Sequence, residues 1–180
     1  MRRKLVLQPR SKPVESSGDG APSSEPEHGS EDEVESPVAD AAVMSDADAK
    51  KTIDEDVKEF FAVRNLEEAD NYFQRLPAAH HHSLVDKLVS LSLESKESDA
   101  QLVTDFFKRA KDQHLCENKA FEDGFTPIVE FLDDIAIDAP MAYKYMANMI
   151  RAVEFSEEER TRIASKLPDS SASKLLALLS

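Results

Sequence analysis

Helical spacing of apolar residues is the feature that most constrains the fold of this chain. From Asp48 to the C-terminus, apolar residues recur at intervals of three and four positions, which places them on one face of an α-helix. The strict alternation of a half-buried β-strand does not occur here over any length. Of the four glycines in the chain, only Gly124 lies in this part. The sequence therefore predicts an all-α fold.

Capping residues and prolines indicate where the helices begin and end. A Ser, Thr, Asp or Asn before an amphipathic run satisfies free amides of the first turn, often together with a Glu three residues later. Thr52 with Glu55 predicts such a start for the first helix, which we expect to end near Arg64. On the same grounds we expect further helices at Asn65 to Pro77, about His80 to Leu93, Glu97 to Asp112, from Asp138, from Ser156 with Glu159, and after Pro168.

The fifth predicted helix has the widest apolar face. That face consists of Phe121, Phe125, Ile128, Val129, Leu132 and Ile135. Such a stripe is typical of a helix that packs against two neighbours. We therefore expect one helix that runs through Ile135.

An internal echo indicates how the helices are arranged. The segment Val57 to Phe61 recurs as Val103 to Phe107, about 46 residues later. This period matches the paired-helix repeats of HEAT proteins. We therefore expect stacked antiparallel helical hairpins of a HEAT-like repeat.

Residues 1–48 differ in composition from the rest of the chain. From Gln8 onward they are rich in Pro, Ser, Gly and acidic residues and contain no aromatic residue. Such a segment buries too little apolar surface to offset an ordering cost of about 1–2 kcal/mol per residue. We expect a disordered acidic linker or tail, in which Ser30 and Ser36 are candidate phosphorylation sites.

The net charge of −14 argues against general attraction to nucleic-acid phosphates. One basic cluster permits only weak, salt-sensitive contact with RNA, and it consists of Arg2, Arg3, Lys4, Arg10 and Lys12. A basic partner protein fits the charge better. Cys116 is the only cysteine, which suits a reducing compartment. Because no stretch is apolar and long enough to span a bilayer, we expect a soluble cytoplasmic protein without membrane contact.

The chain carries no recognisable catalytic motif. It lacks a Gly-rich phosphate loop, a Gly-x-Ser-x-Gly elbow and a His-Glu-x-x-His pair. His80 to His82 point about 100 degrees apart on a helix and cannot converge on one metal ion. His114 and Cys116 lack the further ligands of a zinc site. We expect no enzyme activity, metal or cofactor; a thiol or metal enzyme that uses Cys116 and His114 is the alternative from another class.

An acidic cluster follows the apolar stripe of the fifth predicted helix. Asp133 and Asp134 are expected near the C-terminal end of that helix, where the macrodipole disfavours each carboxylate by about 0.3–1 kcal/mol. This local cost favours an outward acidic surface for arginines of a partner. Asp138 has an equally good structural explanation as the N-cap of the helix after Pro140. A calcium loop would need a central glycine and alternating oxygen ligands, which the segment lacks.

Several short segments together resemble the MI domain of the translation initiation factor 4 gamma scaffold, which also occurs in the programmed cell death 4 tumour suppressor. They are Val57 to Phe61, Leu66 to Ala69, His81 to Val85, Leu93-Glu94, Gly124-Phe125 and, above all, Asp134-x-x-x-Asp138-x-Pro140. The resemblance covers residues 49–155. Residues 156–180 would form a C-terminal helical extension.

The resemblance implies HEAT-like hairpins that bind a DEAD-box RNA helicase, initiation factor 4A, within a translation initiation complex. By the same resemblance, Asp134 and Asp138 would contact the N-terminal RecA-like lobe of the helicase. Charge placement adds Asp133, and the motif adds Pro140, to the expected partner-binding surface. A single MI domain fits stimulation or anchoring of the helicase better than the two-site inhibition of programmed cell death 4. Three alternatives stay open: inhibition of initiation, a different DEAD-box helicase in splicing or ribosome biogenesis, and a purely structural cap of a longer solenoid.

Overall fold

The computed structural model describes residues 44–180. Three expectations fall on residues 1–43 and lie outside the described residues: the disordered tail, the basic cluster and the candidate phosphorylation sites. The boundary of the tail at residue 48 was wrong, because residues 46–48 already belong to the first helix.

The first helix, α1 (Asp46–Val63), begins earlier than its predicted capping box. Ser45 is its N-cap, and the Ser45 hydroxyl accepts a hydrogen bond of 3.2 Å from the amide of Asp48. Thr52 lies inside the helix, so its predicted role as a cap was wrong. The C-terminal boundary was right: Arg64 adopts a left-handed conformation with φ of 58° and ends α1.

The predicted helices at Asn65 to Pro77, His80 to Leu93, Glu97 to Asp112, from Ser156 and after Pro168 agree closely with the structure. The Asn65 side chain accepts a hydrogen bond of 3.0 Å from Glu67 and caps α2 (Leu66–Arg75). Ser156 and Glu159 form both halves of a capping box at α8 (Glu157–Ala164). The remaining helices are a short 3-10 turn η1 (Ala78–His80), α3 (His81–Leu93), α4 (Glu97–Asp112), α5 (Asn118–Glu130), α6 (Leu132–Asp138), α7 (Ala142–Ala152) and α9 (Asp169–Leu179).

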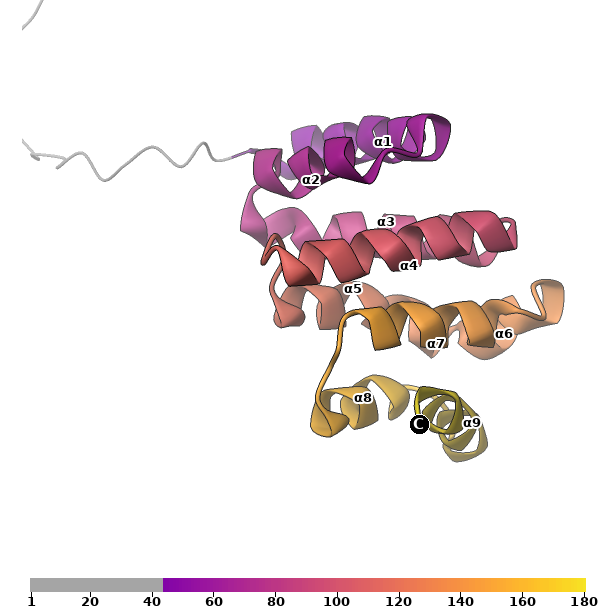
Figure 1. Cartoon of the computed structure of the whole chain (residues 1–180). Coiled ribbons are helices and arrows are strands. Elements are labelled where there is room, and N and C mark those ends of the chain that lie inside the picture. The colour runs from indigo at the N-terminus through magenta and orange to yellow at the C-terminus, as the bar shows by residue number, and fades with distance from the viewer. Residues whose placement is uncertain (1–43) are drawn as a thin grey trace, which may run out of the picture. The chain divides into compact units, whose positions relative to one another are not determined.

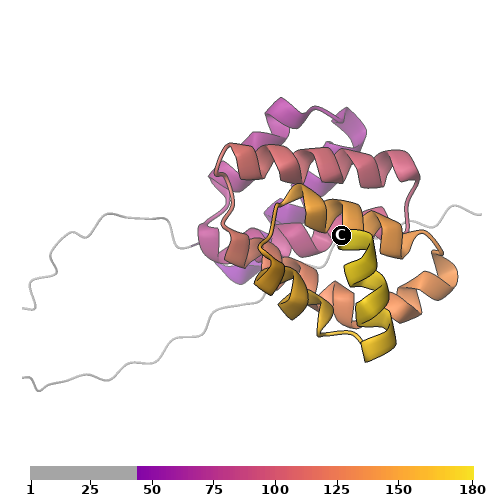
Figure 2. The same cartoon turned by 60° about the horizontal axis from the view of Figure 1, so that its bottom comes forward.

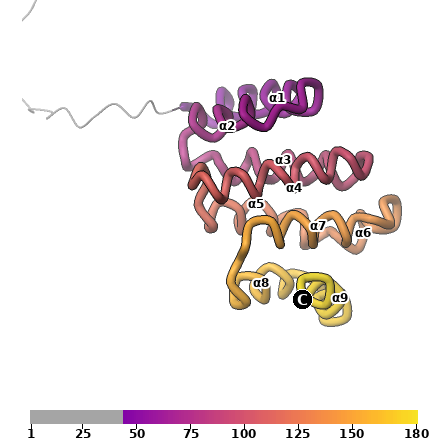
Figure 3. The backbone as a smooth tube through the Cα atoms, viewed as in Figure 1, coloured from indigo at the N-terminus to yellow at the C-terminus, as the bar shows by residue number. Residues whose placement is uncertain are grey.

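The helices form four stacked hairpins, which Figure 1 and Figure 3 show from top to bottom. The hairpins are α1 with α2, α3 with α4, α5 and α6 with α7, and α8 with α9. The first helices contact one another in the order α1, α3, α5, α8, and the second helices in the order α2, α4, α7, α9. No β-strand occurs within residues 44–180. The predicted all-α fold of stacked hairpins is confirmed.

The sequence echo, however, does not mark equivalent positions. Val57 to Phe61 lie on α1, the first helix of the first hairpin. Val103 to Phe107 lie on α4, the second helix of the second hairpin. The two segments share apolar spacing because both pack into the same core, where Phe60 and Phe106 have ring centroids 5.2 Å apart. The echo therefore favoured the right architecture for an incorrect reason.

A chain of aromatic side chains connects the hairpins through the core. Phe106 stacks on Phe73 of α2 at a centroid distance of 5.5 Å, and Phe73 meets Phe121 of α5 at 6.2 Å. Phe125 continues the chain to Phe155, at 6.1 Å, in the loop before α8. Each such pair contributes about 0.5–1.5 kcal/mol beyond the burial of its surface.

The fifth predicted helix is not continuous. The chain turns at Phe131, whose amide bonds to the carbonyl of Ile128, three residues back, at 3.1 Å. This tighter bond separates α5 from α6, one turn after Pro127 has removed a backbone donor from the helix. The prediction of one helix through Ile135 was therefore wrong, although Leu132 is fully buried as its spacing indicated.

Gly124 allows α3 and α5 to pack closely. A Cβ atom at this position would lie 2.6 Å from the Val85 Cβ and 2.7 Å from the His82 carbonyl oxygen. Gly124→Ala should therefore force the two helices apart and lower the free energy of unfolding by about 1–3 kcal/mol in urea denaturation. Glu130→Ala, at an exposed position of the same helix, should change it by less than about 0.5 kcal/mol. Equal effects of the two substitutions would contradict the close packing.

Candidate functional site

The break at Phe131 changes the electrostatic position of the acidic cluster. Asp133 and Asp134 lie in the first turn of α6, and not in the last turn of a longer helix. Negative charge is favourable at a helix N-terminus, so the macrodipole stabilises both carboxylates. The inference of a local electrostatic cost was therefore wrong for these two residues, and their role depends on what each side chain contacts.

Asp138 does not cap the following helix. It is the last residue of α6, and Pro140 lies in the turn that leads to α7. Met141 occupies the N-cap position of α7 and makes no side-chain capping bond. The predicted role of Asp138 as a helix cap was therefore wrong, and its carboxylate does not stabilise the start of α7.

The three aspartates have different environments. The Asp133 carboxylate accepts hydrogen bonds from the hydroxyl of Tyr143 and, at 2.7 and 2.9 Å, from the hydroxyl of Ser171. These bonds hold the pKa of Asp133 below its ordinary value. Asp134 and Asp138 are exposed, and their carboxylates make no hydrogen bond or ion pair with any other residue of 44–180. Since they are four residues apart on one helix, they lie on the same side of α6.

Exposed apolar side chains lie within a few residues of this acidic pair, and sequence reasoning missed them. Phe131 is 60% exposed, Ile137 is 76% exposed and Met141 is 41% exposed. A signal was present, because Ile137 falls outside the apolar stripe of the fifth predicted helix. We call Phe131, Asp134, Ile137, Asp138 and Met141 the α6 surface. Exposed apolar residues beside charged ones are typical of a protein-binding site.

The α6 surface continues toward the end of α3. Glu94, the C-cap of α3, lines a hollow of about 320 Å³ together with Ile135, Asp138 and Ala139. Glu94 is exposed and adds a third carboxylate beside the acidic pair. The charge of this corner therefore favours a cationic partner.

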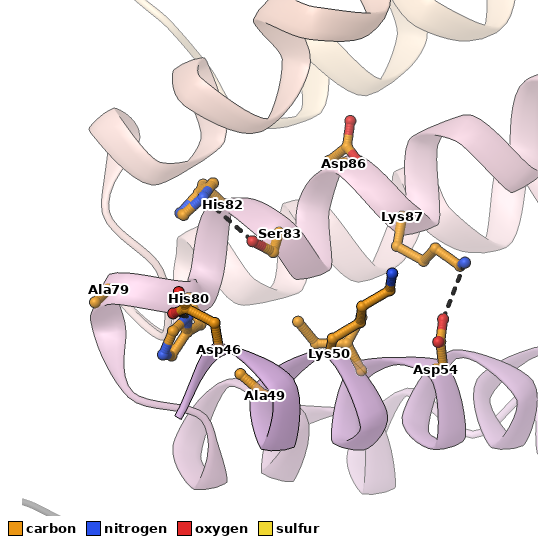
Figure 4. A pocket seen from close by; sticks show the side chains of 11 residues that line it. Asp46, Ala49, Lys50, Asp54, Ala79, His80, His82, Ser83, Asp86 and Lys87 are labelled. Atoms are coloured by element: carbon orange, nitrogen blue, oxygen red, sulfur yellow. Dashed lines mark hydrogen bonds and ion pairs between the residues drawn. The ribbon is translucent and has the colours of Figure 1, made fainter. Parts of the chain in front are cut away.

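The histidine run divides between the core and a groove. His81 is buried, and its Nε2 lies 2.9 Å from the carbonyl oxygens of both Phe73 and Leu76. His80 and His82 line a groove of about 660 Å³ between α1 and α3 (Figure 4). Within residues 44–180, no three His, Cys, Asp or Glu side chains are placed to hold a metal ion.

The groove in Figure 4 carries charges of both signs. Asp54 of α1 pairs with Lys87 of α3 at 2.9 Å, and Lys50 and Asp86 also line it. Burial raises the pKa of the Asp86 carboxyl. Because its charges largely offset one another, the groove selects a partner by charge less clearly than the α6 surface does.

Cys116 and His114 do not form an activated thiol. Cys116 is 6% exposed, and burial raises the pKa of its thiol to about 12. A nucleophilic cysteine needs the opposite shift, toward a thiolate at neutral pH. His114 lies in the turn after α4 in a left-handed conformation with φ of 56°. The geometry gives the thiol-enzyme alternative no support.

The part of the chain that the structure describes contains no candidate for a membrane-spanning helix. None of its helices combines the length and the apolar character needed to cross a bilayer.

Comparison with known proteins gives two findings. The model of the MA3 domain family matches residues 49–155. A stretch of 104 residues is 28% identical to the MA3 domain-containing translation regulatory factor 1 of Arabidopsis thaliana, and it covers 57% of this chain and 15% of that relative. The α6 surface lies inside the residues that the family model matches, whereas α8 and α9 lie beyond them.

The buried thiol should react slowly. With a pKa of about 12, Cys116 has a thiolate fraction at pH 8 roughly 1,000-fold below that of an unfolded thiol. Iodoacetamide should therefore alkylate the native chain at least about 100-fold more slowly than the urea-unfolded chain, as measured by mass spectrometry. Equally fast alkylation of the native chain would restore the thiol as a candidate reactive group.

Proposed function

This chain belongs to the MA3 domain family, a family of helical protein-interaction domains, and we propose that it is a protein-binding module of translation. The partner we propose is the DEAD-box RNA helicase initiation factor 4A, whose activity the bound module modulates in the cytoplasm. Two observations support this choice. The resemblance to the MI domain of initiation factor 4 gamma concerns the same family, and the name of the Arabidopsis relative refers to translation regulation.

The acidic pair of the α6 surface carries the proposal. Asp134 and Asp138 are exposed, lie on one side of α6 and have no partner within residues 44–180. A carboxylate in this condition can accept a charge-assisted, often bidentate, hydrogen bond from an arginine without first breaking an internal contact. Removal of one member of such a pair, once it is buried at an interface, costs on the order of 2–5 kcal/mol.

The apolar residues of the α6 surface indicate that the partner also has an apolar binding surface. Full burial of a side chain such as Phe131 or Ile137 contributes about 1.5–3 kcal/mol relative to exposure. The chain therefore fits a partner surface on which arginines flank an apolar hollow. Such an interface buries the apolar anchors together with the desolvated charged pairs.

Binding to initiation factor 4A should depend on each carboxylate of the pair. We expect Asp134→Ala and Asp138→Ala each to weaken binding by at least about 1.4 kcal/mol, or tenfold, in titration calorimetry with the full chain. Both side chains are exposed, so the free energy of unfolding should change by less than about 0.5 kcal/mol.

The matched control removes a carboxylate far from the α6 surface. Glu55 is exposed on α1, in the first hairpin. Glu55→Ala lowers the net negative charge by the same amount and should leave the affinity unchanged. If all three variants lost affinity equally, the total charge would explain binding; if none did, or if the unmodified chain did not bind, the proposed partner or surface would be wrong.

A further inference from the structure

The orientation of α6 depends on contacts with other helices. α6 has seven residues, which is too short for a helix to be stable on its own in water. Its first turn receives no side-chain cap, and Leu132 is the one residue of α6 that is buried. Ile135 and Ala136 are partly buried against the core, and polar contacts with α7 and α9 add to what holds the direction in which Asp134 and Asp138 point.

A polar cluster supplies such contacts. Asp133, which follows the buried Leu132, accepts hydrogen bonds from Tyr143 of α7 and Ser171 of α9. Burial, followed by the bond to Asp133, raises the pKa of Tyr143 to about 12, so its hydroxyl stays protonated and can donate. Lys174 of α9 places its Nζ 3.8 Å from the centre of the Tyr143 ring, a cation–π contact. We call Asp133, Tyr143, Ser171 and Lys174 the Asp133 cluster.

The apolar side of α9 anchors the helix that supplies half of this cluster. Leu175 is completely buried and Leu179 is 4% exposed, so two of the four C-terminal leucines close the core. α9 contacts both α7 and α8, and Figure 2 shows it as the yellow helix at the near end of the stack. Ser171 and Lys174 are three residues apart and lie on the same side of α9, which allows both to reach the Asp133 cluster.

We infer that α9 is a clamp that holds α6 through the Asp133 cluster and so positions Asp134 and Asp138 for the partner. Asp133 is then a positioning residue and does not itself contact the partner. A helix beyond the residues that the family model matches controls the α6 surface. The consequence for binding rests on the proposed function, whereas the clamp itself does not.

A negative charge at Ser171 should open the clamp. The position lies in the first turn of α9, where a glutamate is favourable for the helix itself. Loosening by Ser171→Glu would therefore come from repulsion of Asp133 and not from loss of helix stability. Ser171→Ala removes the donor without adding charge and should have a smaller effect in the same direction.

Hydrogen exchange of the full chain tests the clamp without any partner. In Ser171→Glu, the amides of residues 132–138 should exchange at least about tenfold faster than in the unmodified chain. Ser173→Glu is the matched control, since Ser173 is exposed and its hydroxyl bonds only to the Asp169 carbonyl of its own helix among residues 44–180. Unchanged exchange in Ser171→Glu, or equal acceleration in both variants, would overturn the clamp.

Calorimetry with initiation factor 4A then separates the clamp from the proposed function. We expect Ser171→Glu to weaken binding about tenfold and Ser173→Glu to leave it unchanged. If α6 loosens but the unmodified chain does not bind, the clamp stands and the proposed function fails. If the unmodified chain binds and Ser171→Glu binds equally well despite faster exchange, α9 does not position the acidic pair and the inference is wrong.

Discussion

Burial of one shared apolar interior is the constraint on which the rest of this structure depends. Each helix has an apolar face that it cannot cover alone, so every hairpin needs the next one in the stack. Aromatic contacts continue this dependence from Phe60 of α1 to Phe155, in the loop before the last hairpin. The side chains between them are Phe106, Phe73, Phe121, Phe107 and Phe125. Gly124 of α5 lets α3 and α5, and with them the second and third hairpins, approach closely.

The candidate site lies where the chain leaves this packed interior. Leu132 stays in the core, but the turn at Phe131 redirects the backbone and leaves Phe131 and Ile137 exposed. Two carboxylates on the same short helix then remain without internal partners within residues 44–180, while the neighbouring Asp133 is held by α7 and α9. The stack of hairpins thus presents the α6 surface, a small surface of exposed acidic and apolar side chains. Contacts of Asp133 with α7 and α9 help to set the direction in which it points.

The sequence predicted those parts of the structure that depend on local chemistry. Asn65 and Ser156 cap helices because the bonds they accept come from amides two or three residues away. The prediction that Thr52 begins the first helix was wrong because a capping pattern inside an amphipathic helix looks the same in sequence as one at its start. The true N-cap, Ser45, lies seven residues earlier. The turn at Phe131 and the contact between Asp133 and Ser171 depend on packing between distant segments, so neither apolar spacing nor charge placement revealed them.

We propose that the α6 surface meets an arginine-bearing partner, initiation factor 4A. Nuclear magnetic resonance of the isotope-labelled full chain, titrated with the N-terminal lobe of that helicase, tests the location directly. We expect the largest changes in amide chemical shift at residues 131–141 and at Glu94. Changes centred on the groove between α1 and α3, or no localised changes at saturating helicase, would contradict it.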